Sequence, residues 1–276
     1  MTQNSQSVVV QGAFDDIRFA DIRFLQEASR FGPLTVLLAS DALCRRLTGQ
    51  PPKFPQAERS YTIQSIRCVE KVHLIDEPIE GGLPSIVEFS PSVWAVREGD
   101  YSSDRQSYCS GRGIDYRVIR ESELAGFPEW KFPPLDSSSR RKKVMVTGCF
   151  DWFHSGHVRF FEECSELGDL IVVVGHDQNL RELKGPEHPL FGQDQRRYMV
   201  GAVRFVHLAV ISTGHGWMDA EPEVIRLRPD IYAVNEDGDK PVKREFCNQY
   251  GIEYVVLKRL PKPGLERRSS TNLRGF

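Results

Sequence analysis

Two histidines three residues apart, His154 and His157, have the types and spacing that most directly suggest chemistry. They lie in GCFDWFHSGH, residues 148–157, between a β-branched run and an amphipathic stretch. We expect a strand, a turn and a helix in that order, which places both imidazoles at the start of the helix. Helix N-termini bind anions, and Gly156 allows a close approach of the backbone. The segment therefore predicts a polyphosphate clamp and phosphoryl or nucleotidyl transfer.

Short β-branched runs alternate with longer amphipathic stretches around this segment, which is typical of βαβ units and a parallel sheet. Open α/β sheets bind ligands at the carboxyl ends of their strands, so the turn after the first strand is the expected site. The predicted strands are residues 144–147, 171–174, 208–211, 231–234 and 254–257, and the predicted helices lie near residues 158–167, 193–204, 222–227 and 242–250.

The chain contains an internal repeat of this pattern. A gapless shift places residues 12–41 on residues 148–177, with glycine, phenylalanine, aspartate and arginine positions agreeing between the copies. We therefore expect an α/β fold made of two tandem Rossmann-like domains with parallel sheets. Prolines, serines and basic residues between the copies are typical of a solvated linker. The predicted organisation is a degenerate domain at residues 1–125, a linker at 126–143 and a catalytic domain at 144–276.

Composition excludes several classes of protein. The 276 residues are 40% hydrophobic and 27% charged, which suffices for two folded cores. A formal net charge of −2 provides no global basic field, so we expect neither nucleic acid nor a membrane as a partner. The six cysteines form no CxxC pair, and we find no secretion signal or long apolar run. We therefore expect a cytoplasmic protein without a zinc site or a disulfide framework.

Residues 148–157 resemble the GxFDxxHxGH signature of the cytidylyltransferase-like nucleotidyltransferases. Lys184, which precedes a glycine, resembles the lysine in the loop after that family's second strand. The pair Arg196 and Arg197 resembles the arginine that opens the next helix, and the run at 269–271 resembles the Ser-Thr-Thr signature that starts the last one. The whole second copy carries this resemblance, and the first copy carries it more weakly.

The tandem layout is similar to that of ethanolamine-phosphate cytidylyltransferases. The resemblance implies an enzyme that transfers CMP from CTP to a phosphoethanolamine-like acceptor and releases pyrophosphate, with Mg²⁺ sharing the phosphate charge. His154, His157 and Lys184 would be catalytic, and Asp177 would bind the metal or cap the next helix. The nucleotide-binding residues would be Gly148, Cys149, Phe150, Gly156, Arg196, Arg197, Ser269, Ser270 and Thr271.

Several alternatives stay open. The family's Arg-Thr-x-Gly lead-in to Ser-Thr-Thr is absent, because residues 263–268 read PGLERR. Heptose-phosphate adenylyltransferases of the same superfamily also lack it, so the enzyme could instead use ATP and a sugar phosphate; a non-catalytic nucleotide-binding protein is the other alternative. Either Arg196 or Arg197 could be the phosphate contact. We expect Asp151 to accept backbone N–H groups of its turn, and Trp217 to fill the core rather than stack on a base.

The first copy has lost the histidine pair. Arg18 and Asp21 stand at the positions of His154 and His157, and Ala20 stands at that of the intervening glycine. Because Asp21 would place a negative charge at the helix start, we expect no triphosphate binding there. We expect this copy to act as a structural partner, giving an intramolecular pseudo-dimer and, as a further option, a homodimer.

Overall fold

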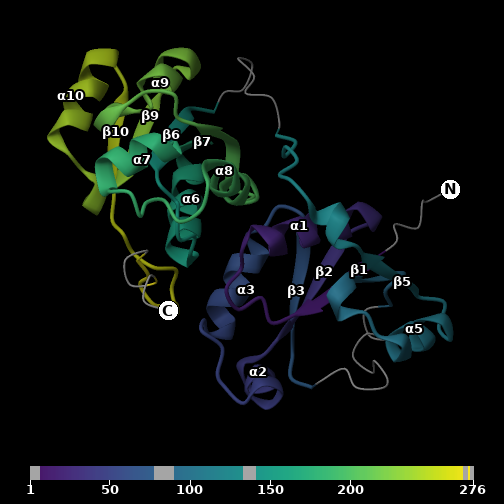
Figure 1. Cartoon of the computed structure of the whole chain (residues 1–276). Coiled ribbons are helices and arrows are strands. Elements are labelled where there is room, and N and C mark those ends of the chain that lie inside the picture. The colour runs from purple at the N-terminus through teal and green to yellow at the C-terminus, as the bar shows by residue number, and fades with distance from the viewer. Residues whose placement is uncertain (1–6, 78–89, 133–140, 270–272, 274–276) are drawn as a thin grey trace. The chain divides into compact units, whose positions relative to one another are not determined.

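The computed structural model of the chain describes residues 7–77, 90–132, 141–269 and 273. The chain divides into two compact units, residues 1–126 and 127–276 (Figure 1). Each unit holds one five-stranded parallel sheet flanked by helices. No helix in these described ranges combines the length and the apolar character needed to cross a bilayer.

The first unit orders its strands β3-β2-β1-β4-β5. Buried residues such as Leu37 and Trp94 form a core between one sheet face and the helices α2 and α5. The strands are β1 (Val8–Gly12), β2 (Leu34–Ala39), β3 (Val69–Ile75), β4 (Val93–Arg97) and β5 (Asp115–Ile119). The helices are α1 (Phe19–Ala28), α2 (Asp41–Thr48), α3 (Gln56–Gln64) and α5 (Ser103–Ser110), with short 3-10 turns η1 (Ser29–Phe31), η2 (Glu98–Asp100) and η3 (Glu121–Leu124).

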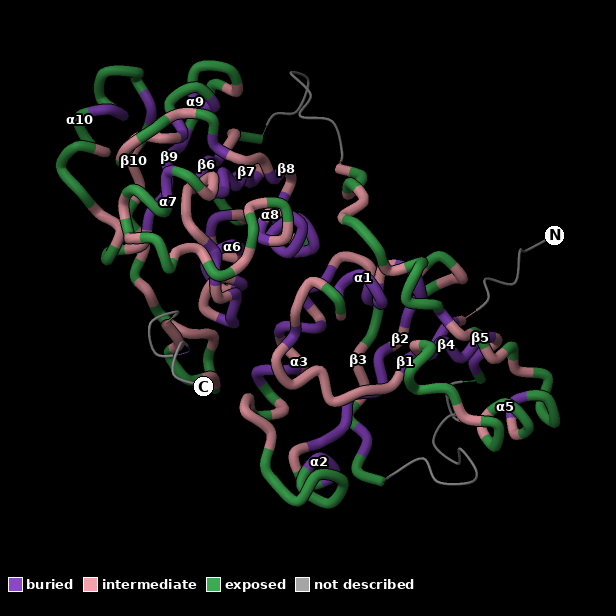
Figure 2. Tube along the Cα trace, viewed as in Figure 1, coloured by how far each residue is buried: buried purple, intermediate pink, exposed green. Residues whose placement is uncertain are grey.

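The second unit repeats this topology with the order β10-β9-β6-β7-β8. Figure 2 shows its central strands buried, and residues such as Ile171 and Tyr232 pack against α9 and α10. The strands are β6 (Lys143–Gly148), β7 (Asp169–Val174), β8 (Val206–Ile211), β9 (Ile231–Asn235) and β10 (Glu253–Leu257). The helices are α6 (Ser155–Leu167), α7 (Asp177–Lys184), α8 (Gln193–Gly201), α9 (Glu221–Leu227) and α10 (Pro241–Tyr250), with 3-10 turns η4 (Gly216–Met218) and η5 (Glu236–Gly238).

The predicted fold class is confirmed: two tandem Rossmann-like units with parallel sheets. All five predicted strands of the second copy lie within observed strands. Helix α7 was not predicted, because only Leu180 and Leu183 are apolar in its eight residues. His176 caps it by accepting a hydrogen bond from the backbone N–H of Asn179.

The turn between β6 and α6 has the same backbone strain as its counterpart in the first unit. Phe150 (φ 52°) and Phe14 (φ 46°) both occupy the left-handed region, which is uncommon for an aromatic residue. A Cβ atom at Gly148 would lie 2.7 Å from the Phe150 ring, and one at Gly12 would lie 2.8 Å from the Phe14 ring. The Gly-x-Phe pattern is therefore a packing requirement of the turn in both copies.

Asp151 ties this turn to a distant loop. Its carboxylate accepts hydrogen bonds from the backbone N–H groups of Leu190 (3.0 Å) and Phe191 (2.9 Å). Asp15 in the first unit accepts the equivalent bonds from residues 53 and 54. We expected donors from the turn of Asp151 itself, whereas these two donors belong to the loop before α8.

A buried arginine joins three segments of each unit. Arg196, with a side chain only 1% exposed, donates to three backbone carbonyls and pairs with Asp177 at 2.6 Å. Arg59 makes the same four contacts in the first unit, including a 2.7 Å pair with Asp41. In the second unit, Arg196 donates to the carbonyl oxygens of Phe191 (2.8 Å), Cys149 (2.7 Å) and Gly175 (2.8 Å).

Part of the predicted linker packs on the second unit. The Trp130 ring stacks on Tyr198 with centroids 5.3 Å apart, and its indole N–H donates to the Tyr198 carbonyl at 3.0 Å. A Cβ atom at Gly201 would come within 2.7 Å of the indole, so glycine is required there. This stretch therefore covers α8 instead of running free in solvent.

We expect Arg196→Ala and Arg59→Ala each to destabilise the unit that contains them by on the order of 3 kcal/mol, because each leaves three carbonyls and a carboxylate without their donor. Urea unfolding of the full chain measures this. Arg197→Ala is the matched control, because Arg197 is a partly exposed neighbour whose loss should cost well below 1 kcal/mol. Equal losses for Arg196→Ala and Arg197→Ala would contradict the interpretation.

Candidate active site

A cavity of about 710 Å³ lies at the carboxyl ends of β6 and β9. The strand order reverses between these two strands, which is where open α/β sheets bind ligands. Its volume is typical of a small-molecule site. The sequence-predicted residues Gly148, Cys149, Phe150, His154, Gly156, His157, Lys184 and Ser269 all line it.

The two histidines form the start of α6. His154 is the N-cap residue, and its Nδ1 accepts a hydrogen bond from the backbone N–H of Gly156 at 3.1 Å. Its ring stacks on that of His157, with centroids 4.0 Å apart. A Cβ atom at Gly156 would lie 2.9 Å from the His154 ring. Glycine between the histidines is therefore needed for the cap itself.

Each histidine keeps one buried nitrogen without a hydrogen-bond partner among the described residues: Nε2 of His154 and Nδ1 of His157. A buried polar atom left unpaired costs about 1–3 kcal/mol. Because Nδ1 of His154 accepts a hydrogen bond, the proton of the neutral ring sits on Nε2. The His154 ring therefore offers a hydrogen-bond donor to a ligand in the cavity.

Both imidazoles are neutral. Burial lowers the pKa of His154 to about 3, and the positive charges of Arg259 and Arg268 add to this. Burial also holds the pKa of His157 well below 6.5, followed by the effects of His154 and Arg259. The pair can therefore donate N–H groups to phosphate oxygens without adding positive charge.

Positive charge reaches the cavity from its rim. Lys184 is the last residue of α7 and lines the cavity as an exposed side chain. The expectation that it lies in a loop is corrected, because the helix extends to it and ends at Gly185, whose φ is 99°. Burial raises the pKa of the neighbouring Cys149 thiol, an effect that Lys184 only partly offsets, so Cys149 is not poised as a nucleophile.

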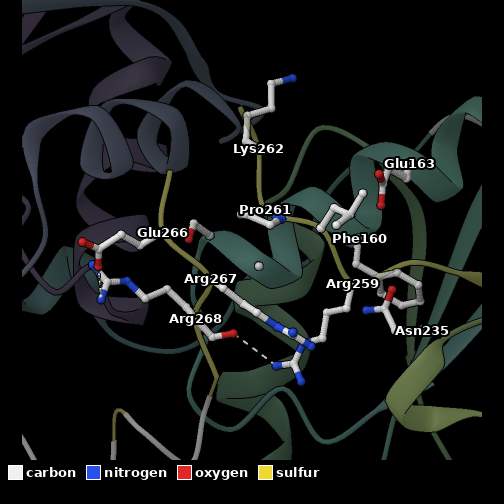
Figure 3. A pocket seen from close by; sticks show the side chains of 12 residues that line it. Phe160, Glu163, Asn235, Arg259, Pro261, Lys262, Glu266, Arg267 and Arg268 are labelled. Carbon is white, nitrogen blue, oxygen red and sulfur yellow. Dashed lines mark hydrogen bonds and ion pairs between the residues drawn. The ribbon is translucent and has the colours of Figure 1, made fainter. Parts of the chain in front are cut away.

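Sequence reasoning missed Arg259 and Asn235. Arg259 follows β10, pairs with Asp237 at 2.5 Å and donates to the Arg268 carbonyl at 3.2 Å (Figure 3). Asn235 ends β9, and its Oδ1 is buried without a partner among the described residues. The position of Arg259 directly after a predicted strand was the available signal. Of the predicted Ser-Thr-Thr-like run, Ser269 lines the cavity, whereas Ser270 and Thr271 lie outside the described residues.

Arg196 and Arg197 do not face this cavity. Arg196, an expected phosphate contact, is buried, and four of its five N–H donors are used by the contacts described above. Arg197 lies 3.6 Å from Glu129 on the side of the linker. The expectation that Trp217 fills the core is wrong, since its side chain is 66% exposed.

Asp177, the expected metal ligand, does not line this cavity. Its carboxylate pairs with Arg196, and it lies at the start of α7 outside the cavity lining. No group of three or more candidate ligands occurs in the part of the chain that the structure describes.

Comparison with known proteins agrees with the geometry. Residues 145–273 match the family model described as cytidylyltransferase-like. The FAD synthase of Ferroglobus placidus is 34% identical over 135 residues, which cover 48% of this chain and 85% of that protein. The chain belongs to the cytidylyltransferase-like family. It is a nucleotidyltransferase, as the sequence predicted.

Two further proteins are similar to part of this chain. The bifunctional protein HldE of Syntrophotalea carbinolica is 32% identical over 147 residues, which make up 50% of this chain but only 28% of that longer protein. The solved lipopolysaccharide core biosynthesis protein of Thermoplasma volcanium GSS1 has a TM-score of 0.38 and 27% identity over 44% of this chain and 98% of that one.

The first unit keeps the sheet topology of the second but fills the equivalent site with its own side chains. Asp21, at the position of His157, pairs with Arg97 at 2.8 Å. Arg18 and Lys53 both pair with Asp16, at 2.6 and 3.0 Å. Each of these cations is thus already ion-paired within the unit.

We expect the second unit to lose stability as pH falls from 7 towards 4. Native His154 stays neutral down to a pKa of about 3, whereas the unfolded chain binds a proton near pH 6.5. Between these values the unfolded state holds more protons, so acid favours unfolding. His154→Asn keeps a capping acceptor and removes this titration. In urea unfolding over a pH series, its slope should be shallower by up to about 1.4 kcal/mol per pH unit, and identical slopes would contradict the assignment.

Proposed function

We propose that the second unit transfers an adenylyl group from MgATP to the phosphate of a small acceptor and releases pyrophosphate. The observation that carries this proposal is the unpaired, neutral histidine pair at the start of α6, at the point where the sheet order reverses. A helix N-terminus with two extra N–H donors suits a polyphosphate and does not suit a cation.

The reaction needs no enzyme nucleophile. An oxygen of the acceptor phosphate attacks the α-phosphorus, a new P–O bond forms, and the bond from the α-phosphorus to the bridging oxygen breaks with both electrons going to pyrophosphate. Catalysis then depends on aligning two anions and on neutralising the charge that develops on the leaving group. His154 and His157 donate to the phosphate oxygens, and Lys184 and Arg259 reduce the repulsion between the anions.

ATP is the donor that the comparisons support best. Relatives named FAD synthase make a dinucleotide that, by its name, contains adenine. The absence of the Arg-Thr-x-Gly lead-in agrees with ATP as well. The tandem layout favours the rival pair, CTP and phosphoethanolamine, so both donors belong in the same experiment.

The test is pyrophosphate release by the purified full chain with ATP or CTP. Each donor is paired with FMN, sugar phosphates or phosphoethanolamine, with magnesium present. We expect release with ATP and one phosphorylated acceptor, together with an adenylylated product detected by mass spectrometry. Turnover with CTP alone would replace the proposed donor, and nucleotide binding without turnover across this acceptor set would count against adenylyl transfer.

His154→Asn should lower kcat on the order of 10²-fold while changing the KM for ATP much less. Asparagine can still cap α6, but it lacks the ring Nε2–H that points at developing phosphate charge. Steady-state kinetics of pyrophosphate release measures both constants. A variant with near wild-type kcat would remove His154 from the catalytic set.

Lys184→Ala should raise the KM for ATP about 10-fold, because it removes a point charge from the triphosphate. Arg181→Ala is the matched control: Arg181 is an exposed cation in the same last turn of α7, but it does not line this cavity. Similar kinetics for the two variants would assign Lys184 to solvent.

A further inference from the structure

We propose that Asn235 and Phe160 form the subsite that recognises the nucleobase of the donor, with the Asn235 carboxamide bonding the base edge and the Phe160 ring stacking on its face. This inference rests on the proposed function, since it places the base beside a triphosphate held at α6. It adds a residue pair that decides which nucleotide is accepted.

The first observation is an amide that lacks a partner. Asn235 ends β9, opposite the turn that carries the histidines, and its buried Oδ1 accepts no hydrogen bond from the described residues. A free buried acceptor in this position is unfavourable unless a ligand donates to it. A neutral carboxamide suits an uncharged base better than a phosphate, and it offers one acceptor and one donor side by side.

The second observation is the shape of the wall around it. Asn235, Phe160 and Arg259 line both the main cavity and a small adjoining recess, whose other walls include Leu260 and Pro261. Figure 3 shows the Asn235 amide beside the Phe160 ring, with Arg259 next to them. The aromatic face of Phe160 next to the polar amide of Asn235 matches a flat heterocycle, which is apolar above and below its plane and polar around its rim, whereas the charged residues of the recess, such as Lys262 and Glu266, lie on its other walls.

The third observation comes from the first unit, where the repeat places Arg97 at the position of Asn235 and Phe24 at that of Phe160. There the planar guanidinium lies 4.8 Å from the centre of the Phe24 ring. It also donates to Asp21 at 2.8 Å. The first unit therefore fills this position with a flat, hydrogen-bonding group of its own. In the second unit the shorter Asn235 cannot reach over the ring in the same way, and Phe160 lines the cavity.

The chemistry of the edge gives a sharp test. Adenine presents an amino donor next to a ring acceptor, so it can pair with both ends of a carboxamide. Asn235→Asp replaces the donor with a second acceptor that repels the adenine ring nitrogen. Guanine presents two neighbouring donors, which can pair with both oxygens of a carboxylate.

The experiment is calorimetric titration of the full chain, wild type and Asn235→Asp, with ATP, GTP and inorganic triphosphate. The added negative charge weakens the binding of all three ligands, so the ratio of the Kd for ATP to the Kd for GTP isolates the effect of the substitution on base recognition. We expect wild type to bind ATP more tightly than triphosphate, and the variant to raise that ATP-to-GTP ratio by about 10-fold or more. Asn248→Asp, an exposed site on α10, adds the same charge away from the cavity and should leave the ratio unchanged.

A second variant guards against a folding defect. Asn235→Arg installs the residue of the first unit, which should cover Phe160 and abolish the advantage of ATP over triphosphate without lowering the melting temperature substantially. An unchanged ATP-to-GTP ratio in Asn235→Asp overturns the inference. The inference is also overturned if Asn235→Asp instead changes the ratio of the Kd for ATP to the Kd for 2′-deoxy-ATP, because Asn235 would then contact the ribose. If wild type binds neither ATP nor triphosphate, both the proposed function and the base subsite are contradicted. If wild type binds ATP and triphosphate with equal Kd, only the base subsite is contradicted.

Discussion

The buried arginine of each unit is the constraint on which its ligand-binding edge depends. Arg196 joins the turn after β6, the end of β7 and the loop before α8 through three carbonyls, and its charge is balanced by Asp177. A guanidinium buried this deeply is tolerated only because its donors are matched. The same contacts by Arg59 in a unit that has lost the histidines indicate that this arginine serves the fold and not the chemistry.

The two units share one sheet topology but differ in the polar side chains at the equivalent site. In the first, Asp21 and Arg97 satisfy each other, and a second ion-paired group forms around Asp16. In the second, His154, His157 and Asn235 keep buried polar atoms that find no partner in the described protein. Buried polar atoms without a partner among the described residues occur in both units, but those of His154, His157 and Asn235 line one cavity, which is the pattern expected of a functional site.

Neutral histidines also suit the chemistry of two meeting anions. Burial beside Arg259 and Arg268 prevents protonation of His154, so its N–H is a directed dipole that remains available across the physiological pH range. In the proposed reaction, the exposed cation Lys184 on the cavity rim carries the net charge instead. The histidines at the start of α6 would thus fix the positions of the phosphates, whereas the exposed rim cation would neutralise their charge.

The sequence by itself determined the alternation of strands and helices, the repeat, and the anion-binding turn, because periodicity and turn chemistry are properties of contiguous residues. Even so, it missed α7, whose few apolar residues carry no clear helical period. Only the tertiary structure decided that Arg196 and Asp177 form an ion pair with each other, that Trp217 is exposed and that Arg259 lines the cavity. Each of these depends on which distant segments meet in space, and that is set by the packing of the sheet and its helices rather than by neighbouring residues in the chain.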